Sequence, residues 1–141
     1  MTSSCSLLAA SRYLVIITNV IITIDGPAAS GKSSVSRGVA DSLQIPFVSS
    51  GLLYRAATYL ALKHSFNPSD ETGLLECLNQ HQIAFEARSL EPNHIFVDGE
   101  DVTTALHTDD VDANVSVVAK HPNIRLWVDD RLREIKGSFV V

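Results

Sequence analysis

The sequence has few of the residues that mark disulfide-rich or nucleic-acid-binding proteins. Two of its 141 residues are cysteine, Cys5 and Cys77, and no Cys-x-x-Cys pair or Cys/His cluster accompanies them. Such spacing does not form a disulfide framework, so we expect a reduced, cytoplasmic protein. Lys and Arg number 11 against 16 Asp and Glu, which gives a formal net charge of −5. This acidic balance argues against a broad nucleic-acid surface, which would carry clustered cations, but it allows a small nucleotide ligand in a cleft.

Long apolar runs are also scarce. The candidate at 14–24 contains Thr18 and Asn19 and is shorter than the roughly 20 apolar residues that cross a bilayer. The run at 7–10 has no basic segment before it, so it does not fit a secretory signal. We therefore interpret 1–19 as a leader whose nature the sequence leaves open, and we expect no membrane association.

The first third of the chain alternates between strand and helix patterns. Residues 20–24 are β-branched and apolar and end at the turn 25–27, which is typical of a buried parallel strand. A helix is expected from about Lys32, then a short strand at 46–48 and a second helix at 51–64. This alternation in a chain of one-domain length predicts an α/β fold with a parallel sheet and flanking helices.

Apolar periodicity assigns a buried face to each of these helices. In the first helix, Val35, Val39 and Leu43 recur every four residues and are expected to face the sheet. In the second helix, the residues expected to point inward are Leu52, Leu53, Ala56 and Leu60.

Residues 67–108 interrupt this alternation. A helix capped by Ser69 or Asp70 is expected first, and two strand-like runs follow at 83–87 and 94–97. An Asp-Gly turn after the second run indicates another reversal of the chain. The segment therefore predicts a small antiparallel β insertion.

After Thr108 the pattern is helical again, in two pieces separated at Pro122. An apolar strand then opens at 137–141, and we expect that the C-terminal part of the fold is missing from this chain. In the second helical piece, the expected buried stripe is Ile124, Val128, Leu132 and Ile135. The chain is thus divided into a leader (1–19), a core (20–66), an insertion (67–108), a helical pair (109–136) and a strand start (137–141).

The turn between the first strand and the first helix matches G-x-x-x-x-G-K-[ST] at every required position. Small residues let successive main-chain amides point toward an anion, and the helix dipole adds positive potential. Lys32 is expected to contact the β- and γ-phosphates of ATP, and the Ser33 hydroxyl to hold Mg²⁺ through ATP. The alternative is a glycine-rich turn with an exposed lysine. The ATP-binding set is Gly26, Pro27, Ala28, Ala29, Ser30, Gly31, Lys32, Ser33 and Ser34.

A second anion-binding segment follows the second strand. The Ser50 hydroxyl, the helix N-terminus at Gly51 and the Arg55 guanidinium are groups that hold a phosphate. On residue type alone, Arg55 fits a solvated helix position equally well. A P-loop also occurs in GTPase-like switches and hydrolases, but the guanine-reading pattern Asn-Lys-x-Asp is absent from this sequence.

Together these motifs resemble bacterial cytidylate kinases, members of the nucleoside monophosphate kinase group of P-loop proteins. The resemblance runs from about Val20 to the last residue and includes the P-loop and Ser-Gly-x-x-Tyr-Arg at 50–55, together with Val-Asp-Gly-Glu-Asp-Val at 97–102. It implies an enzyme of pyrimidine nucleotide metabolism that transfers the γ-phosphoryl group of ATP to CMP or dCMP. It also implies Mg²⁺ as cofactor and nucleotides as partners. We expect a monomer that binds neither nucleic acid nor membrane.

The resemblance also implies residue roles. Lys32 would be catalytic, Ser50 and Arg55 would hold the CMP phosphate, and Ser116 and Arg125 would contact the base, with Arg125 alternatively reaching the phosphate. From the residues alone, Ser116 fits an ordinary helix serine, and Arg125 fits a surface partner of Asp129, four residues on. The implied CMP-binding set is Ser50, Gly51, Tyr54, Arg55, Ser116 and Arg125.

Two positions depart from the family pattern. Ser49 stands where many relatives have Asp, and His107 where many have Arg, so we assign neither a catalytic role. The family's later Gly-Arg-Asp motif and lid arginines are absent from these 141 residues. A nucleotide-binding fragment with little turnover is therefore the alternative expectation for the chain as given.

Overall fold

The computed structural model of the chain describes residues 19–27 and 30–141. Most of the expected leader, including Cys5, lies outside the described residues, as do Ala28 and Ala29 of the phosphate-binding turn. The elements are β1 (Ile21–Ile22), α2 (Lys32–Leu43), α3 (Gly51–Lys63), α4 (Glu71–Asn79), β2 (Ile83–Glu86), β3 (His94–Val97), β4 (Glu100–Asp101), the 3₁₀ helix η1 (Thr103–His107), α5 (Asp109–Ala119), α6 (Pro122–Arg133) and β5 (Phe139–Val140).

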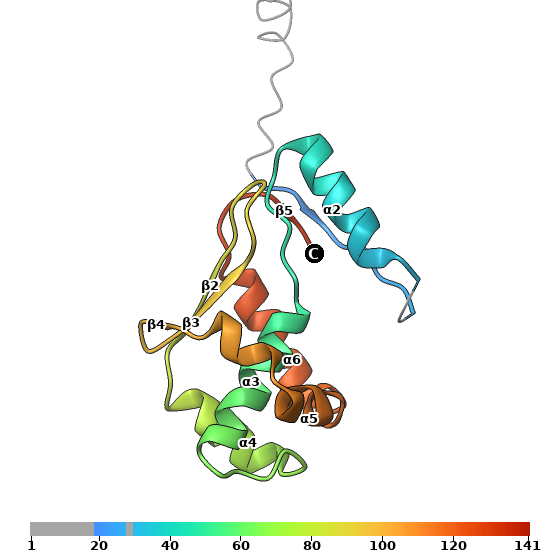
Figure 1. Ribbon diagram of the computed structural model, residues 1–141. Coiled ribbons are helices and arrows are strands. Elements are labelled where there is room, and N and C mark those ends of the chain that lie inside the picture. The colour runs from blue at the N-terminus through green and yellow to red at the C-terminus, as the bar shows by residue number, and fades with distance from the viewer. Residues whose placement is uncertain (1–18, 28–29) are drawn as a thin grey trace, which may run out of the picture.

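The parallel sheet joins the two ends of the described chain. Strand β1 pairs with β5 in parallel, and β5 bonds on its other side to the segment around Phe47. The Val140 amide donates to the Pro46 carbonyl at 3.0 Å, and the Val48 amide donates to the Val140 carbonyl at 2.7 Å. Strand β1, the segment around Phe47 and strand β5 therefore lie side by side (Figure 1). The predicted α/β class with a parallel sheet is confirmed.

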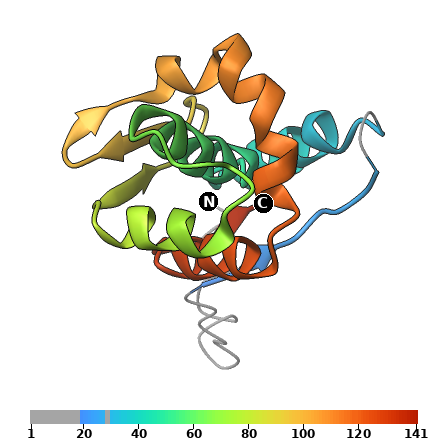
Figure 2. The same cartoon turned by 90° about the horizontal axis from the view of Figure 1, so that it is seen from below.

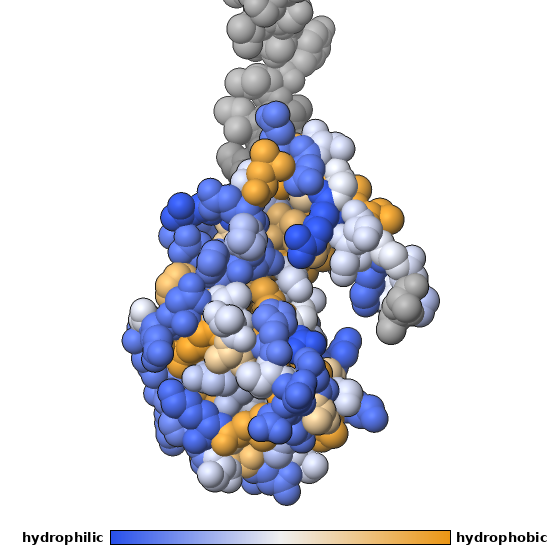
Figure 3. Space-filling view, in the orientation of Figure 1, coloured by the Kyte–Doolittle hydropathy of each residue, from blue (hydrophilic) through white to orange (hydrophobic). Residues whose placement is uncertain are grey.

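Helix α2 packs on this sheet with a different face from the one its periodicity predicts. Val35 and Leu43 are 57% and 52% exposed, whereas Ser36 and Ala40 are 3% and 0% exposed. The expected inward face was wrong because Ser36 and Ala40 share the same four-residue spacing one position along and are small enough for close packing against the strands. Ser36 satisfies its buried hydroxyl by donating to the Lys32 carbonyl at 2.6 Å. Hydrophobic surface is accordingly visible beside α2 (Figure 3).

Helix α3 forms the centre of the main hydrophobic core. Helices α4, α5 and α6 surround it (Figure 2), and η1 and β3 also contact it. The inward residues predicted for this helix are confirmed, with Leu52 partly buried. Truncating a buried leucine such as Leu60 to alanine would cost about 2–5 kcal/mol. The buried apolar residues of α3 are Leu53, Ala56, Ala57, Leu60 and Ala61.

The predicted antiparallel insertion is present as a three-stranded sheet in the order β2-β3-β4. Asp98 and Gly99 form the turn between β3 and β4 with φ of 51° and 85°, a conformation that Asp and Gly tolerate. Upstream, Asp70 caps α4 by accepting a hydrogen bond from the Gly73 amide at 3.2 Å. The capping residue is therefore Asp70, one of the two that the sequence predicted.

Helices α5 and α6 are separated at Pro122, as predicted. Ile124, Trp127 and Val128 are buried against α3 and α4, while Leu132 is partly buried and Ile135 lies beyond the end of α6. Among the described residues, no helix combines the length and apolarity needed to cross a membrane.

Candidate active site

A cavity of about 580 Å³ opens where the phosphate-binding turn, the loop after Val48, the start of α3 and helix α6 meet. The surface is hollowed between α2 and the N-terminal end of α3 (Figure 3). The position follows from the topology, since ligands of parallel α/β sheets bind beyond the carboxyl ends of the strands. Six residues that the sequence assigned to ligand binding line this cavity: Lys32, Ser33, Ser50, Gly51, Tyr54 and Arg125.

The Lys32 side chain lies across the opening of the phosphate-binding turn. Gly31 has φ of +83°, a left-handed conformation that disfavours any residue with a Cβ, and α2 begins immediately after it. The Lys32 ammonium donates to the Gly26 carbonyl at 3.0 Å. Pro27 and Ser30 of the turn do not line the cavity, and neither does Ser34 in the first turn of α2.

Both helices that begin at the cavity lack a side-chain cap. Among residues 19–27 and 30–141, no side chain caps the first turn of α2, after Gly31, or of α3, after Ser50. By contrast, Asp70 caps α4 and Thr108 caps α5. The first amides of a helix need acceptors, and the helix dipole makes this end positive. Two open helix N-termini at one cavity suit two separate phosphate groups.

A buried asparagine that the sequence analysis missed holds the loop before α3. Asn93 is 9% exposed, and its amide donates to the Phe47 carbonyl at 2.7 Å. Its oxygen accepts from the Ser49 amide at 2.8 Å. These two bonds fix the backbone directly before Ser50. No local sequence signal announces the contact, because Asn93 belongs to the insertion, 44 residues from Ser49.

Tyr54, Arg125 and Asp129 all line the cavity on the side of α6. Burial raises the pKa of the Tyr54 phenol; the nearby charge of Arg125 lowers that pKa and the charge of Asp129 raises it. The predicted alternative that Arg125 pairs with Asp129 is wrong, since the described residues contain no such ion pair. Arg125 instead donates to the Ala119 carbonyl at 3.4 Å.

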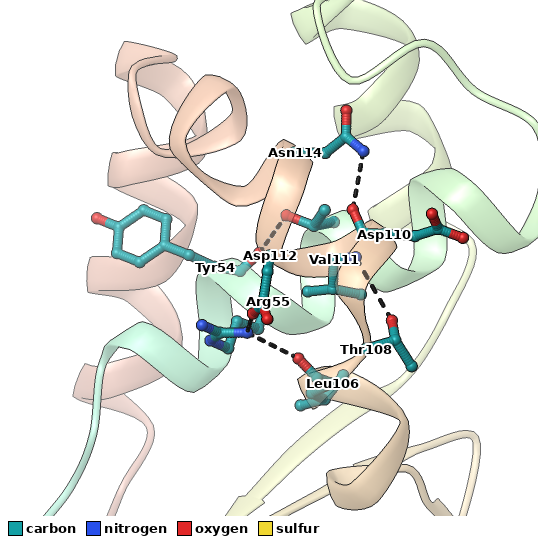
Figure 4. Close-up of polar contacts among 9 residues, drawn as sticks. Tyr54, Arg55, Leu106, Thr108, Asp110, Val111, Asp112 and Asn114 are labelled. Atoms are coloured by element: carbon teal, nitrogen blue, oxygen red, sulfur yellow. Dashed lines mark hydrogen bonds and ion pairs between the residues drawn. The ribbon is translucent and has the colours of Figure 1, made fainter.

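Arg55 and Ser116 do not line the cavity. The Arg55 side chain is 27% exposed and extends toward η1 and α5, while Tyr54 points toward α6 (Figure 4). The Arg55 Nη1 donates to the Leu106 carbonyl at 3.0 Å and to Asp112 Oδ1 at 2.5 Å. The alternative of Arg55 as a solvated helix residue is therefore wrong. Ser116 is exposed on α5.

Of the two positions that depart from the family pattern, Ser49 lines the cavity and His107 is exposed at the end of η1. In the part of the chain that the structure describes, no three His, Cys, Asp or Glu side chains gather as a metal site. The Ser33 hydroxyl fits Mg²⁺ that arrives with a nucleotide, because this ion commonly takes one or two protein oxygens and completes its shell with phosphate and water.

A parallel strand, a glycine-containing turn with its lysine and an uncapped helix define an α/β protein of the P-loop nucleotide-binding class. The sequence profile described as "Cytidylate kinase" matches residues 22–140. The chain belongs to the cytidylate kinase family, which confirms the resemblance of its motifs.

Individual relatives agree with this assignment. The chain is 52% identical over 120 residues to the cytidylate kinase of Thermus thermophilus, covering 85% of this chain and 57% of that protein. It is 51% identical over 121 residues to the enzyme of the same name from Deinococcus radiodurans, covering 86% and 58%. It is also 40% identical over 122 residues to a bifunctional pantoate ligase/cytidylate kinase of Trichodesmium erythraeum, covering 85% and 23%. The chain thus spans less than two thirds of the length of the relatives it matches.

Proposed function

We propose that the protein carrying this chain transfers the γ-phosphoryl group of ATP to CMP or dCMP. The observation that carries the proposal is the convergence of two uncapped helix N-termini with Lys32 and Arg125 on one cavity. One helix end suits the triphosphate of the donor and the other suits the monophosphate of the acceptor. Membership of the cytidylate kinase family supports the choice of cytidine nucleotides.

On the donor side, the amides at the start of α2 and the Lys32 ammonium bind the β- and γ-phosphates. Lys32 exchanges its bond to the Gly26 carbonyl for a phosphate oxygen. Mg²⁺, when bound with ATP and held by Ser33, neutralises charge on the phosphate oxygens.

On the acceptor side, Ser50 and the start of α3 orient the monophosphate, with Arg55 as a further cation. Tyr54 of α3 and Arg125 of α6 line the cavity together with Ser50. In this proposal the nucleoside binds beside these two side chains. Ser116 contributes to base recognition in this proposal. The attacking group is a phosphate oxygen that is already ionised at neutral pH, so alignment and cationic stabilisation carry the reaction and no strong base is needed.

The wider setting belongs to the same proposal. Residues 67–108 form the acceptor-side insertion on a core of 20–66, and the protein works as a cytoplasmic monomer on nucleotides, without nucleic-acid or membrane partners. The free, buried thiol of Cys77 supports a reducing compartment.

The test is ADP release in a coupled assay with ATP, Mg²⁺ and each nucleoside monophosphate as acceptor. The proposal predicts turnover that depends on CMP or dCMP. A preference for AMP would contradict it. Equal ADP release without any acceptor would identify a hydrolase instead.

A further inference from the structure

The Arg55 guanidinium is anchored through one of its two terminal nitrogens. An arginine side chain offers five N–H donors, two of them on Nη1. The bonds to the Leu106 carbonyl and to Asp112 both use Nη1. The Nε and Nη2 atoms bond to no group in the described part of the chain. Three N–H donors therefore stay free, and two of them, one on each nitrogen, point along the Nε–Nη2 edge of the guanidinium. Figure 4 shows Arg55 with its two acceptors, Leu106 and Asp112.

Both acceptors of Arg55 sit on fixed structure. Leu106 is 0% exposed, so its carbonyl is held by the core. Asp112 lies in the first turn of α5, which is capped by Thr108 through its bond to the Val111 amide at 3.4 Å. The anchored arginine therefore has little rotamer freedom left to lose when it binds a ligand.

The position of Arg55 along α3 links it to the acceptor end of the cavity. Gly51 lines the cavity and precedes Arg55 by four residues, and residues four apart lie on the same side of a helix. The free Nε–Nη2 edge has the spacing that binds two phosphate oxygens at once.

We propose that Asp112 is a positioning residue for acceptor binding: with the Leu106 carbonyl it holds Arg55 so that the Nε–Nη2 edge receives the acceptor phosphate. The inference rests on the proposed function and adds a residue to its acceptor site. Asp112 does not touch the phosphate and acts through Arg55. A carboxylate that merely competed for Arg55 would have the opposite effect, since its removal would free the cation for the ligand.

The test uses the full-length protein that carries this chain and compares Asp112→Asn with the wild type in steady-state phosphorylation of CMP. We expect the KM for CMP to rise about tenfold, the scale of one charge-assisted hydrogen bond, with the KM for ATP unchanged. Asp110→Asn is the matched control, because Asp110 belongs to the same helix turn and points away from Arg55 (Figure 4). The Asp110→Asn substitution removes one negative charge from the N-terminal turn of α5, as Asp112→Asn does, and is expected to leave the KM values for CMP and ATP unchanged.

A double substitution separates positioning from a general structural effect. The lysine ammonium cannot form the two parallel hydrogen bonds that a guanidinium edge forms, so Arg55→Lys removes the group that Asp112 is proposed to orient. In that background, Asp112→Asn is expected to cause no further rise in the KM for CMP. Equal effects in both backgrounds, an unchanged KM, or a lower KM in the single variant would overturn the inference. Absence of CMP phosphorylation by the wild type would instead overturn the proposed function, and the inference with it.

Discussion

The Lys32 ammonium and the Gly26 carbonyl are joined by a hydrogen bond of 3.0 Å across the phosphate-binding turn. Lys32 is exposed and lines the cavity, while Gly26 is half-buried. The lysine is therefore held at the mouth of the turn by a neutral acceptor. A phosphate oxygen is a stronger acceptor for an ammonium group than a carbonyl is, so this bond is one that a nucleotide can replace.

In the full-length protein that carries this chain, replacing Lys32 with alanine is expected to lower kcat for CMP phosphorylation by about 10²–10³, the scale for one preorganised charge donor. The measurement is steady-state ADP release at saturating substrates. Lys120→Ala is the control, because Lys120 is exposed at the C-terminal end of α5 and outside the cavity. A loss below tenfold for the Lys32 variant would remove this residue from the catalytic group.

The same glycine-to-alanine change is expected to have opposite effects at Gly31 and Gly38. In the described part of the chain, nothing lies within 4 Å of a Cβ at either site, so the two sites differ in backbone conformation. At Gly31, with φ of +83°, alanine should lower the free energy of unfolding by about 1 kcal/mol. At Gly38, inside α2, alanine should raise it by about 0.5–1 kcal/mol through helix propensity.

Urea unfolding of the two variants under the same conditions measures both changes. Equal shifts of the same sign would show that the left-handed turn before α2 is not a constraint on the fold.

Asn93→Ala is expected to weaken both stability and acceptor binding. The change leaves the Phe47 carbonyl and the Ser49 amide without their partner, which costs about 1–3 kcal/mol. Loosening of the backbone before Ser50 should raise the KM for CMP while leaving the KM for ATP unchanged. Asn79→Ala, at an exposed position at the end of α4, should change neither quantity. A stability loss without any change in the KM for CMP would refute the positioning of this loop by Asn93.

The carboxyl group of Asp98 is expected to contribute to the free energy of unfolding in a pH-dependent way. Its pKa is lowered chiefly by a hydrogen bond from His81 at 2.7 Å and next by the Gln82 amide at 2.8 Å. A carboxyl group with a lowered folded-state pKa stabilises the fold above its unfolded pKa, and this contribution is lost as pH falls through the folded value. Asp98→Asn should therefore be less stable than wild type near neutral pH, and the difference should shrink below about pH 4.

Chemical unfolding of both proteins across this pH range provides the comparison. Glu100→Gln is the control, because Glu100 is an exposed carboxyl two residues along the same hairpin. If the difference in free energy of unfolding between Asp98→Asn and wild type stayed constant over the whole pH range, the stabilising role given to the ionised Asp98 carboxylate would be contradicted.

Local patterns in the sequence predict much of this fold because their physical causes are local. The start of α2 at Lys32 follows from the glycine before it, and the break at Pro122 follows from the missing amide of proline. The face of α2 could not be predicted in the same way. Periodicity identifies spacing, but packing against β5 selected the small residues Ser36 and Ala40 over Val35.

The candidate site likewise contains features that the sequence predicts and a contact that it does not. The phosphate-binding turn and Ser50 are recognisable because each is a short motif with its own backbone requirements. The Arg55–Asp112 pair joins residues 57 positions apart. Such a contact depends on how α3 and α5 are packed, and neither helix carries a local signal for it.

The most direct test of the account follows the backbone amide resonances of the protein while ATP and Mg²⁺ are added. The account predicts that the amides of Gly31, Lys32 and Ser33 shift most strongly with ATP, and that adenosine without phosphates leaves them unchanged. Subsequent CMP should then move the amides of Ser50 and Gly51. Saturable ATP binding that leaves the amides at the start of α2 undisturbed would contradict the central claim.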